Sequence, residues 1–323
     1  MTTIDQAALL LKLPAGDYFV FDDERKGALQ SALVGLTDAS TAPDGDGESV
    51  PEPLLAIGAP DAVDLDARTT VPVLIGTVQS GQRRWQVNPL TNVYLWVRDL
   101  ESGALQVSTP LLKERRGEKQ APSGKGVPPD ELNAATTITA VDLVDLRQQL
   151  ESLEPGRHVV TAVDYDLRSS TLALRLTSGT PRPEPAWAAP HAYVQSEADV
   201  REEVPEVVRI PATAAPSGPI EARVEMQVGL GSGVLRSPVD GPDAEWHWVC
   251  HFVLLQLDER PVIVAARAAV QPIGDAVRPT RFNAVFTVDL HAGARSPLGV
   301  GAALVYLEAG DRVLGPYPLD VTG

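Results

Sequence analysis

The chain has 323 residues and a formal net charge of −16, with 27 Lys and Arg against 43 Asp and Glu. This length predicts about two domains, because a single hydrophobic core stops growing at roughly 250 to 300 residues. The acidic balance argues against a nucleic-acid partner and against an anionic membrane, since both bind basic surfaces. The single cysteine, Cys250, excludes an intramolecular disulfide and any multi-cysteine zinc or iron–sulfur site.

The N-terminal segment lacks the pattern of a secretory signal. Its first basic residue, Lys12, follows the apolar stretch 7–11 instead of preceding it. The longest apolar runs, such as residues 252–255, are far shorter than the roughly 20 residues that a membrane helix needs. These patterns predict a soluble, cytoplasmic protein with no membrane partner.

The first 53 residues predict a small N-terminal appendage followed by a linker. Apolar runs at residues 9–13 and 18–21 flank a turn cluster, which predicts a hairpin. Four apolar residues then recur at helical spacing: Leu29, Ala32, Leu33 and Leu36. This spacing predicts a short amphipathic helix. Residues 38–53, rich in Asp, Gly, Ser and Pro, are expected to form the linker.

From residue 54 onward the dominant apolar period is two. One example is the alternating set Ala222, Val224, Met226 and Val228. Such alternation is typical of strands with one buried face. Segments that are apolar on both faces, at residues 93–97 and 246–257, predict central strands. Short strands with turn signals between them predict a mainly β protein built from antiparallel sandwiches.

A proline-rich break divides the β region. Eight prolines occur between residues 181 and 219, a density that does not fit inside a sheet. The break predicts a first β-sandwich unit over residues 54–180, a linker over 181–204 and a second unit over 205–323. An edge strand over residues 204–210 is expected to dock beside the second unit.

The two predicted units share an order of features. Each has a wide hairpin, then a strand that ends in Val-Asp-Leu, at residues 141–143 and 288–290, then a hairpin preceded by glycine. The first unit adds a leucine stripe at Leu143, Leu146, Leu150 and Leu153, where immunoglobulin-like sandwiches often cross between sheets. In this order the chain resembles two tandem sandwiches of the immunoglobulin-like superfold, which by itself carries no function. Duplication of one ancestral unit stays an open alternative.

The segment 246–251 contains the weak metal candidates His247, Cys250 and His251. On a helix these three would converge on one metal ion. The neighbouring Trp, Val and Phe residues predict a strand instead, on which the two histidines lie about 13 Å apart and Cys250 points to the other face. We therefore expect Cys250 to be a small buried hydrophobe, with no metal site and no cofactor.

Paired carboxylates are a second candidate set, at Asp64 and Asp66 and at Asp164 and Asp166. Each pair shares one face of a predicted strand. Such pairs can flank a glycosidic bond, or they can keep an exposed strand edge soluble. No cleft is evident in the sequence, so the second interpretation is preferred.

Basic residues gather in one predicted loop, over residues 113–132. Four of them are the candidate partner-binding residues: Lys113, Arg115, Arg116 and Lys119. The cluster can tether an acidic surface, or it can be a plain solvated insertion.

Together these patterns favour a non-enzymatic interaction or assembly protein that binds a protein partner, or itself, through sheet edges or loops. The first alternative is a carbohydrate-binding module or a carboxylate-dependent hydrolase, with Trp85, Trp96 or Trp187 as a sugar platform. The second alternative is a metal-binding protein that uses the segment containing Cys250.

Overall fold

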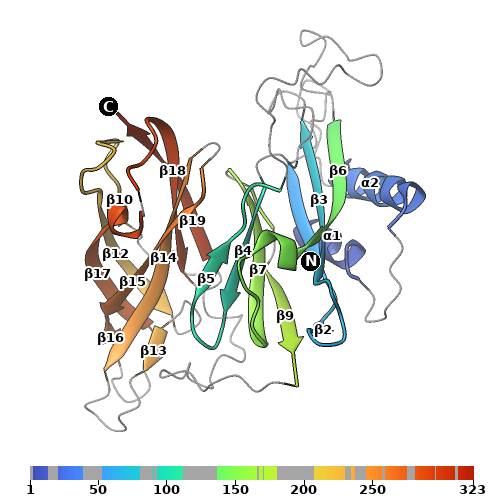
Figure 1. Ribbon diagram of the computed structural model, residues 1–323, viewed down its shortest axis with the longest axis horizontal. Coiled ribbons are helices and arrows are strands. Elements are labelled where there is room, and N and C mark those ends of the chain that lie inside the picture. Colours follow the sequence, from blue (N-terminus) through green and yellow to red (C-terminus); the bar gives the residue numbers. More distant parts are fainter. Residues whose placement is uncertain are drawn as a thin grey trace. The chain divides into compact units, whose positions relative to one another are not determined.

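The structure is a computed structural model that describes most of the chain. The described residues are 3–13, 21–38, 53–80, 90, 93–111, 137–165, 167–169, 171–179, 207–229, 234–236, 245–256, 259–274, 281–294, 296–309 and 312–323. The protein is mainly β, as the apolar period of two predicts, and two helices precede the strands (Figure 1).

By its internal contacts the chain forms two compact units. The first consists of Met1–Val97 and Ser108–Pro181, and the second consists of Arg98–Val107 and Arg182–Gly323. The chain therefore enters the second unit at Arg98, leaves it after Val107 and returns at Arg182.

The strands of the first half of the chain form a small and a large sheet. The small sheet has the order β1-β3-β6, from Leu54–Gly58, Pro72–Ser80 and Thr137–Asp145. The large sheet has the order β2-β9-β7-β4-β5, and β8 also pairs with β7. Its strands are β2 (Ala62–Asp64), β9 (Leu172–Thr177), β7 (Gly156–Asp164), β4 (Tyr94–Asp99), β5 (Leu105–Val107) and β8 (Leu167–Arg168).

The core of the first unit takes alternate side chains from both sheets. The small sheet contributes Leu55, Ile57, Val73 and Ile75. The large sheet contributes Leu95, Val97, Val160, Ala162, Leu174 and Leu176. The side chains between these residues on each strand point to the other face of the sheet, because successive side chains of a strand alternate between its two faces.

Two N-terminal helices cover the outer face of the small sheet. They are α1 (Thr3–Leu10) and α2 (Asp23–Asp38). A second buried cluster joins the helical segment to the sheet, and it consists of Ala7, Leu11, Leu13, Leu33, Leu54, Ala56, Leu74, Val78 and Val141. Two glycines make room for this layer. A Cβ atom on Gly58 would lie 2.1 Å from the backbone oxygen of Leu11, and one on Gly76 would lie 2.6 Å from Cδ1 of Leu33.

The predicted N-terminal helix is confirmed as part of α2, but the predicted hairpin before it is wrong. Leu9 and Leu10 end helix α1 instead of starting a strand. A short unbroken apolar run fits a strand and a buried helix turn equally well. The packing of Ala7 and Leu11 against the sheet favours the helix. The second half of the predicted hairpin falls largely on residues 14–20, outside the described residues.

The second unit also contains a small and a large sheet. The small sheet has the order β10-β12-β17-β16, from Val207–Arg209, Glu221–Gly229, Arg281–Asp289 and Gln271–Ile273. The large sheet has the order β11-β19-β18-β14-β13, and β15 also pairs with β14. Its strands are β11 (Thr213–Ala214), β19 (Arg312–Val321), β18 (Gly301–Ala309), β14 (Trp246–Gln256), β13 (Val234–Arg236) and β15 (Val262–Ala269). The described residues of β10 confirm the edge strand predicted there.

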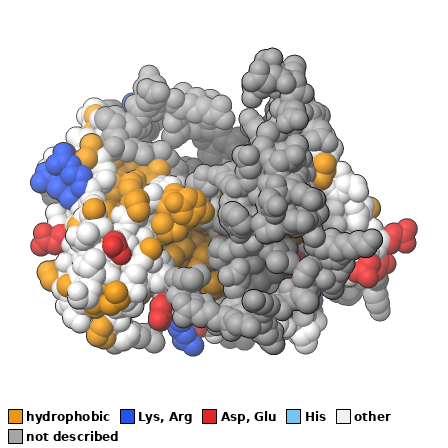
Figure 2. Space-filling view, turned by 90° about the horizontal axis from the view of Figure 1, so that it is seen from above, with side chains coloured by type: hydrophobic (Ala, Val, Ile, Leu, Met, Phe, Trp, Pro, Cys, Tyr) orange, Lys and Arg blue, Asp and Glu red, His pale blue; other side chains and the backbone are white. Residues whose placement is uncertain are grey.

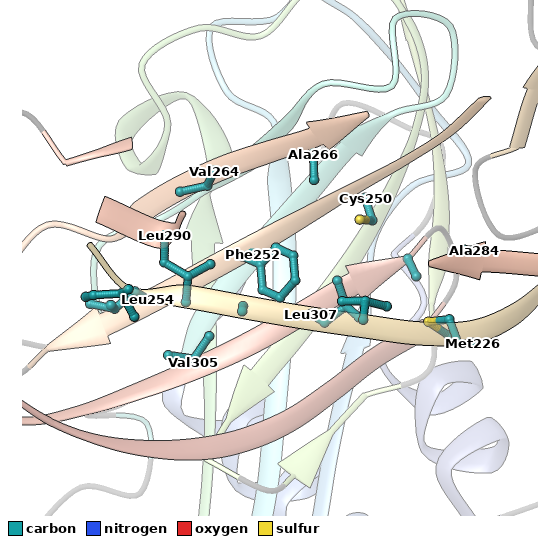
Figure 3. Packing of buried hydrophobic residues seen from close by; sticks show 14 of the residues in the cluster. Met226, Cys250, Phe252, Leu254, Val264, Ala266, Ala284, Leu290, Val305 and Leu307 are labelled. Atoms are coloured by element: carbon teal, nitrogen blue, oxygen red, sulfur yellow. The ribbon is translucent and has the colours of Figure 1, made fainter. Parts of the chain in front are cut away.

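The core of the second unit also lies between its two sheets. Strand β12 contributes the predicted alternating set Ala222, Val224, Met226 and Val228. The large sheet contributes Trp248, Cys250, Phe252, Leu254, Ala303, Val305 and Leu307. Figure 3 shows part of this core, with Cys250, Leu254, Val305 and Leu307 around the ring of Phe252.

The two halves of the chain repeat one strand connectivity. In each half, the first strand pairs antiparallel with the third strand, as β1 with β3 and β10 with β12. The short strand that follows the first pairs parallel with the last strand, as β2 with β9 and β11 with β19. The order of features in the sequence therefore corresponds to a repeated arrangement of strands.

In both repeats, an aspartate at the end of a long strand accepts two backbone hydrogen bonds at the turn that follows. Asp145 Oδ1 accepts hydrogen bonds from the backbone N–H groups of Val71 at 2.8 Å and Arg147 at 3.1 Å. In the second unit, Asp289 Oδ1 accepts from the N–H groups of Ile220 at 2.8 Å and His291 at 2.9 Å. Each aspartate caps a short helix, α3 (Leu146–Gln149) or η4 (Leu290–Gly293).

The positions of these two aspartates change the predicted alignment of the Val-Asp-Leu tripeptides. Asp145, not Asp142, corresponds to Asp289, so the Val-Asp-Leu match is three residues out of register. The leucine stripe does not form one helix either, because Leu143 lies in β6 and α3 ends at Gln149. A strand followed directly by one helical turn produces the same leucine spacing as a short helix.

Replacing Asp289 with Ala should lower the free energy of unfolding by about 1 to 2 kcal/mol, because two backbone N–H groups lose their acceptor. Asp289→Asn keeps an acceptor oxygen and should cost less. Urea denaturation of the full chain measures both effects. An alanine variant as stable as the natural protein would show that the corner contributes nothing.

Candidate functional site

Strand β14 organises the polar and apolar sides of the large sheet in the second unit. It has 11 residues and confirms the strand predicted for the segment around Cys250. Trp248, Cys250 and Phe252 point into the core between the sheets. His251 points to the opposite face, where it lies directly across from Glu308 on β18.

A buried ionic cluster forms on this opposite face, from Arg98, His251 and Glu308. Arg98 Nη1 donates to both carboxylate oxygens of Glu308, at 2.7 and 2.8 Å, and Arg98 Nη2 donates to the carbonyl oxygen of Val249 at 3.1 Å. His251 Nδ1 lies 2.9 Å from Oε2 of Glu308. The three side chains are between 4% and 6% exposed, and all three belong to the second unit.

Arg98 begins a structured hairpin tip, Arg98–Val107. Asp99 Oδ1 accepts from the N–H groups of Glu101 at 2.8 Å and Ser102 at 3.2 Å, and Asp99 Oδ2 accepts from the Ser102 hydroxyl at 2.9 Å. Gly103 has φ of +73°, a left-handed conformation that glycine adopts without strain. A Cβ atom on Gly103 would lie 3.9 Å from Cγ1 of Val249, so the tip lies close against β14.

The contacts of the buried ionic cluster favour a structural role. An imidazole held through Nδ1 by a carboxylate is one half of a nucleophilic triad. The neighbouring thiol, Cys250, points to the other side of the sheet and does not face the ring of His251. Arginine and carboxylate neutralise each other, and their hydrogen bonds fix the tip of the hairpin on the sheet.

Sequence reasoning missed Arg98 and Glu308. Each is a charged residue directly after an apolar strand segment, at residues 94–97 and 305–307. A charge in a buried strand needs a partner, since an unpaired buried charge is very costly. The position of each charge at the end of an apolar strand is the signal that a buried partner is needed, but it does not identify that partner.

The three metal candidates do not converge. His247 lies beside Glu245, with 3.3 Å between Nε2 and the carboxylate, while Cys250 is in the core and His251 is bound to Glu308. Among the residues that the structure describes, no group of three or more His, Cys, Asp or Glu side chains is placed to hold a metal ion.

Burial raises the pKa of the Cys250 thiol far above its ordinary value of 9.0, and the negative charge of Glu308 adds to the effect while Arg98 opposes it. Above about pH 9, the thiol therefore ionises in the unfolded chain and stays protonated in the folded one. The unfolded state then binds fewer protons, so the free energy of unfolding falls as pH rises.

For Cys250, the expected slope above pH 9 is a loss of about 1.4 kcal/mol per pH unit, relative to a Cys250→Ala variant. Lysine and tyrosine titrations are shared by both proteins and cancel in the comparison. Urea denaturation between pH 8 and 10.5 measures the difference. Parallel pH profiles would contradict the burial of this thiol.

The carboxylate pairs do not form a site in the described residues. Asp64 Oδ1 accepts from the N–H group of Asp66 at 2.9 Å, and Asp66 accepts from Gly179 N–H and the Ser178 hydroxyl. These two hydrogen bonds lower the pKa of Asp66. Asp164 is buried and accepts from Gln79 Nε2 at 3.0 Å. The fourth carboxylate of the predicted pairs, at position 166, lies outside the described residues.

Several other predicted residues cannot serve or are not described. Trp96 is 2% exposed and is not a sugar platform. The candidates outside the described residues are Trp85, Trp187, Lys113, Arg115, Arg116 and Lys119.

The small sheet of the second unit has an open edge that sequence reasoning did not locate. Leu290 N–H donates to Ile220 O at 2.8 Å. Only alternate residues of an antiparallel pair exchange such bonds. The backbone N–H and C=O groups of the odd-numbered residues of β17 therefore point away from β12. Strand β16 pairs with the first part of this edge, at residues 281–283. In the described part of the chain, no strand pairs with the outward groups of Val285 and Thr287.

In the first unit, the corresponding edge strand, β6, lies under the N-terminal helices. Leu146 N–H donates to Val71 O at 2.9 Å, so the odd-numbered residues of β6 point their backbone N–H and C=O groups away from β3. Because Asp145 corresponds to Asp289, Val141 is the counterpart of Val285. Val141 is 0% exposed and packs under the N-terminal helices, whereas Val285 is 62% exposed. Gln30 on α2 also donates to the carbonyl oxygen of Thr139 on this edge, at 3.4 Å. The open edge thus belongs to the second unit.

Exposed large hydrophobic side chains occur on both units. On the face seen in Figure 2, hydrophobic groups gather on the left of the view. Val300, at 69%, and Val285, at 62%, are the most exposed large hydrophobic residues that the structure describes.

Neither the models of protein families nor the curated protein sequences matched this chain. Within the described residues, none of the helices combines the length and the apolar character needed to cross a membrane.

Proposed function

We propose that this chain is a non-enzymatic interaction or assembly protein, built from two tandem immunoglobulin-like sandwich units, that binds a protein partner through the open edge of β17. The observation that carries the proposal is the contrast between Val285, which is exposed, and Val141, which is buried at the same position of the other repeat. In one repeat the helices cover this edge strand, and in the other Val285 is exposed to solvent.

The strand order supports the immunoglobulin-like assignment. In that superfold, one sheet holds the first, second, fourth and fifth strands, and the other holds the third, sixth and seventh. Strands β10, β12, β16 and β17 match the first group, and β14, β18 and β19 match the second. The large and small sheets share one apolar core, as the layers of a sandwich do.

The open edge fits an extended segment of a partner. Outward N–H and C=O groups on two alternate residues can extend the antiparallel ladder by strand addition. On the outer sheet face, Val207, Glu225 and Val285 are neighbours in one cross-strand row. A partner strand added at this edge with an apolar side chain opposite Val285 would extend the row.

A photo-crosslinking amino acid at position 285 of the full chain, expressed in the native host, tests the proposal. We expect one discrete protein adduct. The matched control places the same amino acid at Leu9, which is 60% exposed on α1. A Val285→Lys change, with the crosslinker moved to position 287, should remove the adduct, because a charged edge opposes strand addition. Equal labelling from positions 285 and 9 would contradict the proposal.

A further inference from the structure

The core-facing side of β17 changes along the strand. Phe282, which pairs with β16, is 0% exposed. Phe286 and Val288 lie beyond the part that β16 pairs, and both are half-buried against the core of the second unit. The ring of Phe286 packs edge-on against Trp248, with 5.7 Å between the ring centroids. The open edge therefore carries partly exposed core side chains as well as unpaired backbone groups.

The first repeat carries a charge at the position of Phe286. With Asp145 matched to Asp289, the counterpart of Phe286 is Asp142. Asp142 shares a strand face with Val144, which packs against the core of the first unit. A charged side chain that points inward at a sheet edge opposes the addition of another strand, because that strand would bury the charge. In the second repeat, Phe286 places an apolar ring at this position instead.

From this contrast we infer that the partner of the open edge is a strand of alternating character, with an apolar side chain that packs beside Phe286. This inference rests on the proposed function, because it names the chemistry of the segment that β17 binds. Pairing uses the outward N–H and C=O groups of Val285 and Thr287. The partner residue opposite Phe286 then belongs to a non-hydrogen-bonded pair, in which side chains approach most closely.

The inward position is where the edge selects its partner. Backbone pairing by itself accepts almost any extended sequence, and side-chain pockets supply the specificity. An apolar side chain placed over Phe286 and Val288 removes apolar surface from water. A charged side chain there would be buried without a partner. The partner segment is therefore distinguished by apolar side chains at every second position, and not by its overall hydrophobicity.

Peptide binding to the full chain tests this inference. The probe is a short synthetic peptide in which Thr and Leu alternate between terminal lysines, and its control has the same composition with the leucines adjacent. In a backbone NMR titration, the alternating peptide should bind with a dissociation constant below about 1 mM and shift the signals of Val285, Phe286 and Thr287. The control peptide should bind at least about tenfold more weakly. Methylation of the probe's backbone nitrogens should have the same effect, because it removes the donors of the ladder.

Variants of the chain locate the binding. Phe286→Asp copies the first repeat and should weaken binding of the alternating peptide at least about tenfold. Leu9→Asp is the matched control, since Leu9 is 60% exposed on α1, and should bind as the natural protein does. Thr287→Pro removes an outward N–H without changing a core side chain, so it gives the same test if Phe286→Asp does not fold.

No binding of the alternating peptide, equal binding of the two peptides, or unchanged binding by Thr287→Pro would overturn the inference. If position 285 still crosslinks a discrete protein in the native host, the proposed function stands and only the chemistry of the partner strand is wrong.

Discussion

Replacing Glu308 with Ala should lower the free energy of unfolding by about 3 to 5 kcal/mol, the largest loss expected for a single polar side chain in this protein. The change leaves the Arg98 guanidinium buried without its carboxylate, and it removes the hydrogen bond to His251 Nδ1. The cost comes mainly from leaving the Arg98 charge buried without a partner, and less from the loss of its attraction to Glu308. Denaturant unfolding of the full chain, followed by tryptophan fluorescence, measures it.

The exposed ion pair between Arg223 and Glu225 is the matched control for Glu308. Its side chains are 55% and 36% exposed, so Glu225→Ala should cost no more than about 1 kcal/mol. A double variant that removes both Arg98 and Glu308 should be more stable than Glu308→Ala, because no buried charge is left unpaired. Equal losses for Glu308→Ala and Glu225→Ala would contradict the burial of the cluster.

Replacing Gly58 with Val should undock helix α1 and cost about 3 kcal/mol, at the upper end of the range for overpacked positions. The nearest atoms to a new Cβ are the backbone oxygen and carbon of Leu11, at 2.1 and 2.3 Å, and a backbone cannot move aside as a side chain can. The buried surface of Ala7 and Leu11 would be lost with the docking of the helix.

Gly27, in the second turn of α2, is the control for this prediction. No atom lies within 4 Å of a Cβ placed there, so Gly27→Ala should stabilise the helix by about 0.5 to 1 kcal/mol. Far-ultraviolet circular dichroism and thermal unfolding compare the two variants. A Gly58→Val protein with unchanged helicity and stability would show that α1 does not dock on β1.

Strands β12 and β17 of the second unit were predictable because apolar side chains recur at every second position. Residues 222–228 and 281–289 each carry apolar side chains at every second position, and burial of one sheet face requires this pattern. The helix α1 was not predictable in the same way. Its leucine run at residues 9–11 has no period of its own, and only the sheet beneath it selects the helix.

The candidate sites depended on contacts that sequence distance conceals. Cys250 and His251 could be assigned to opposite faces from strand geometry alone, but the partners of His251 could not be named. Glu308 lies 57 residues from His251 and 210 residues from Arg98. The open edge was equally hidden, since Val141 and Val285 have similar sequence surroundings. Only the docking of α2 on one repeat distinguishes them.

Amide hydrogen exchange at single-residue resolution tests the central claim most directly, because the proposed function depends on the open edge of β17. The account predicts fast exchange at Val285 and Thr287, slow exchange at Phe286 and Val288, which face β12, and slow exchange at Val141 under the helices. Protection at Val285 equal to that at Phe286, in the purified protein at low concentration, would contradict the claim that this edge is free to bind a partner.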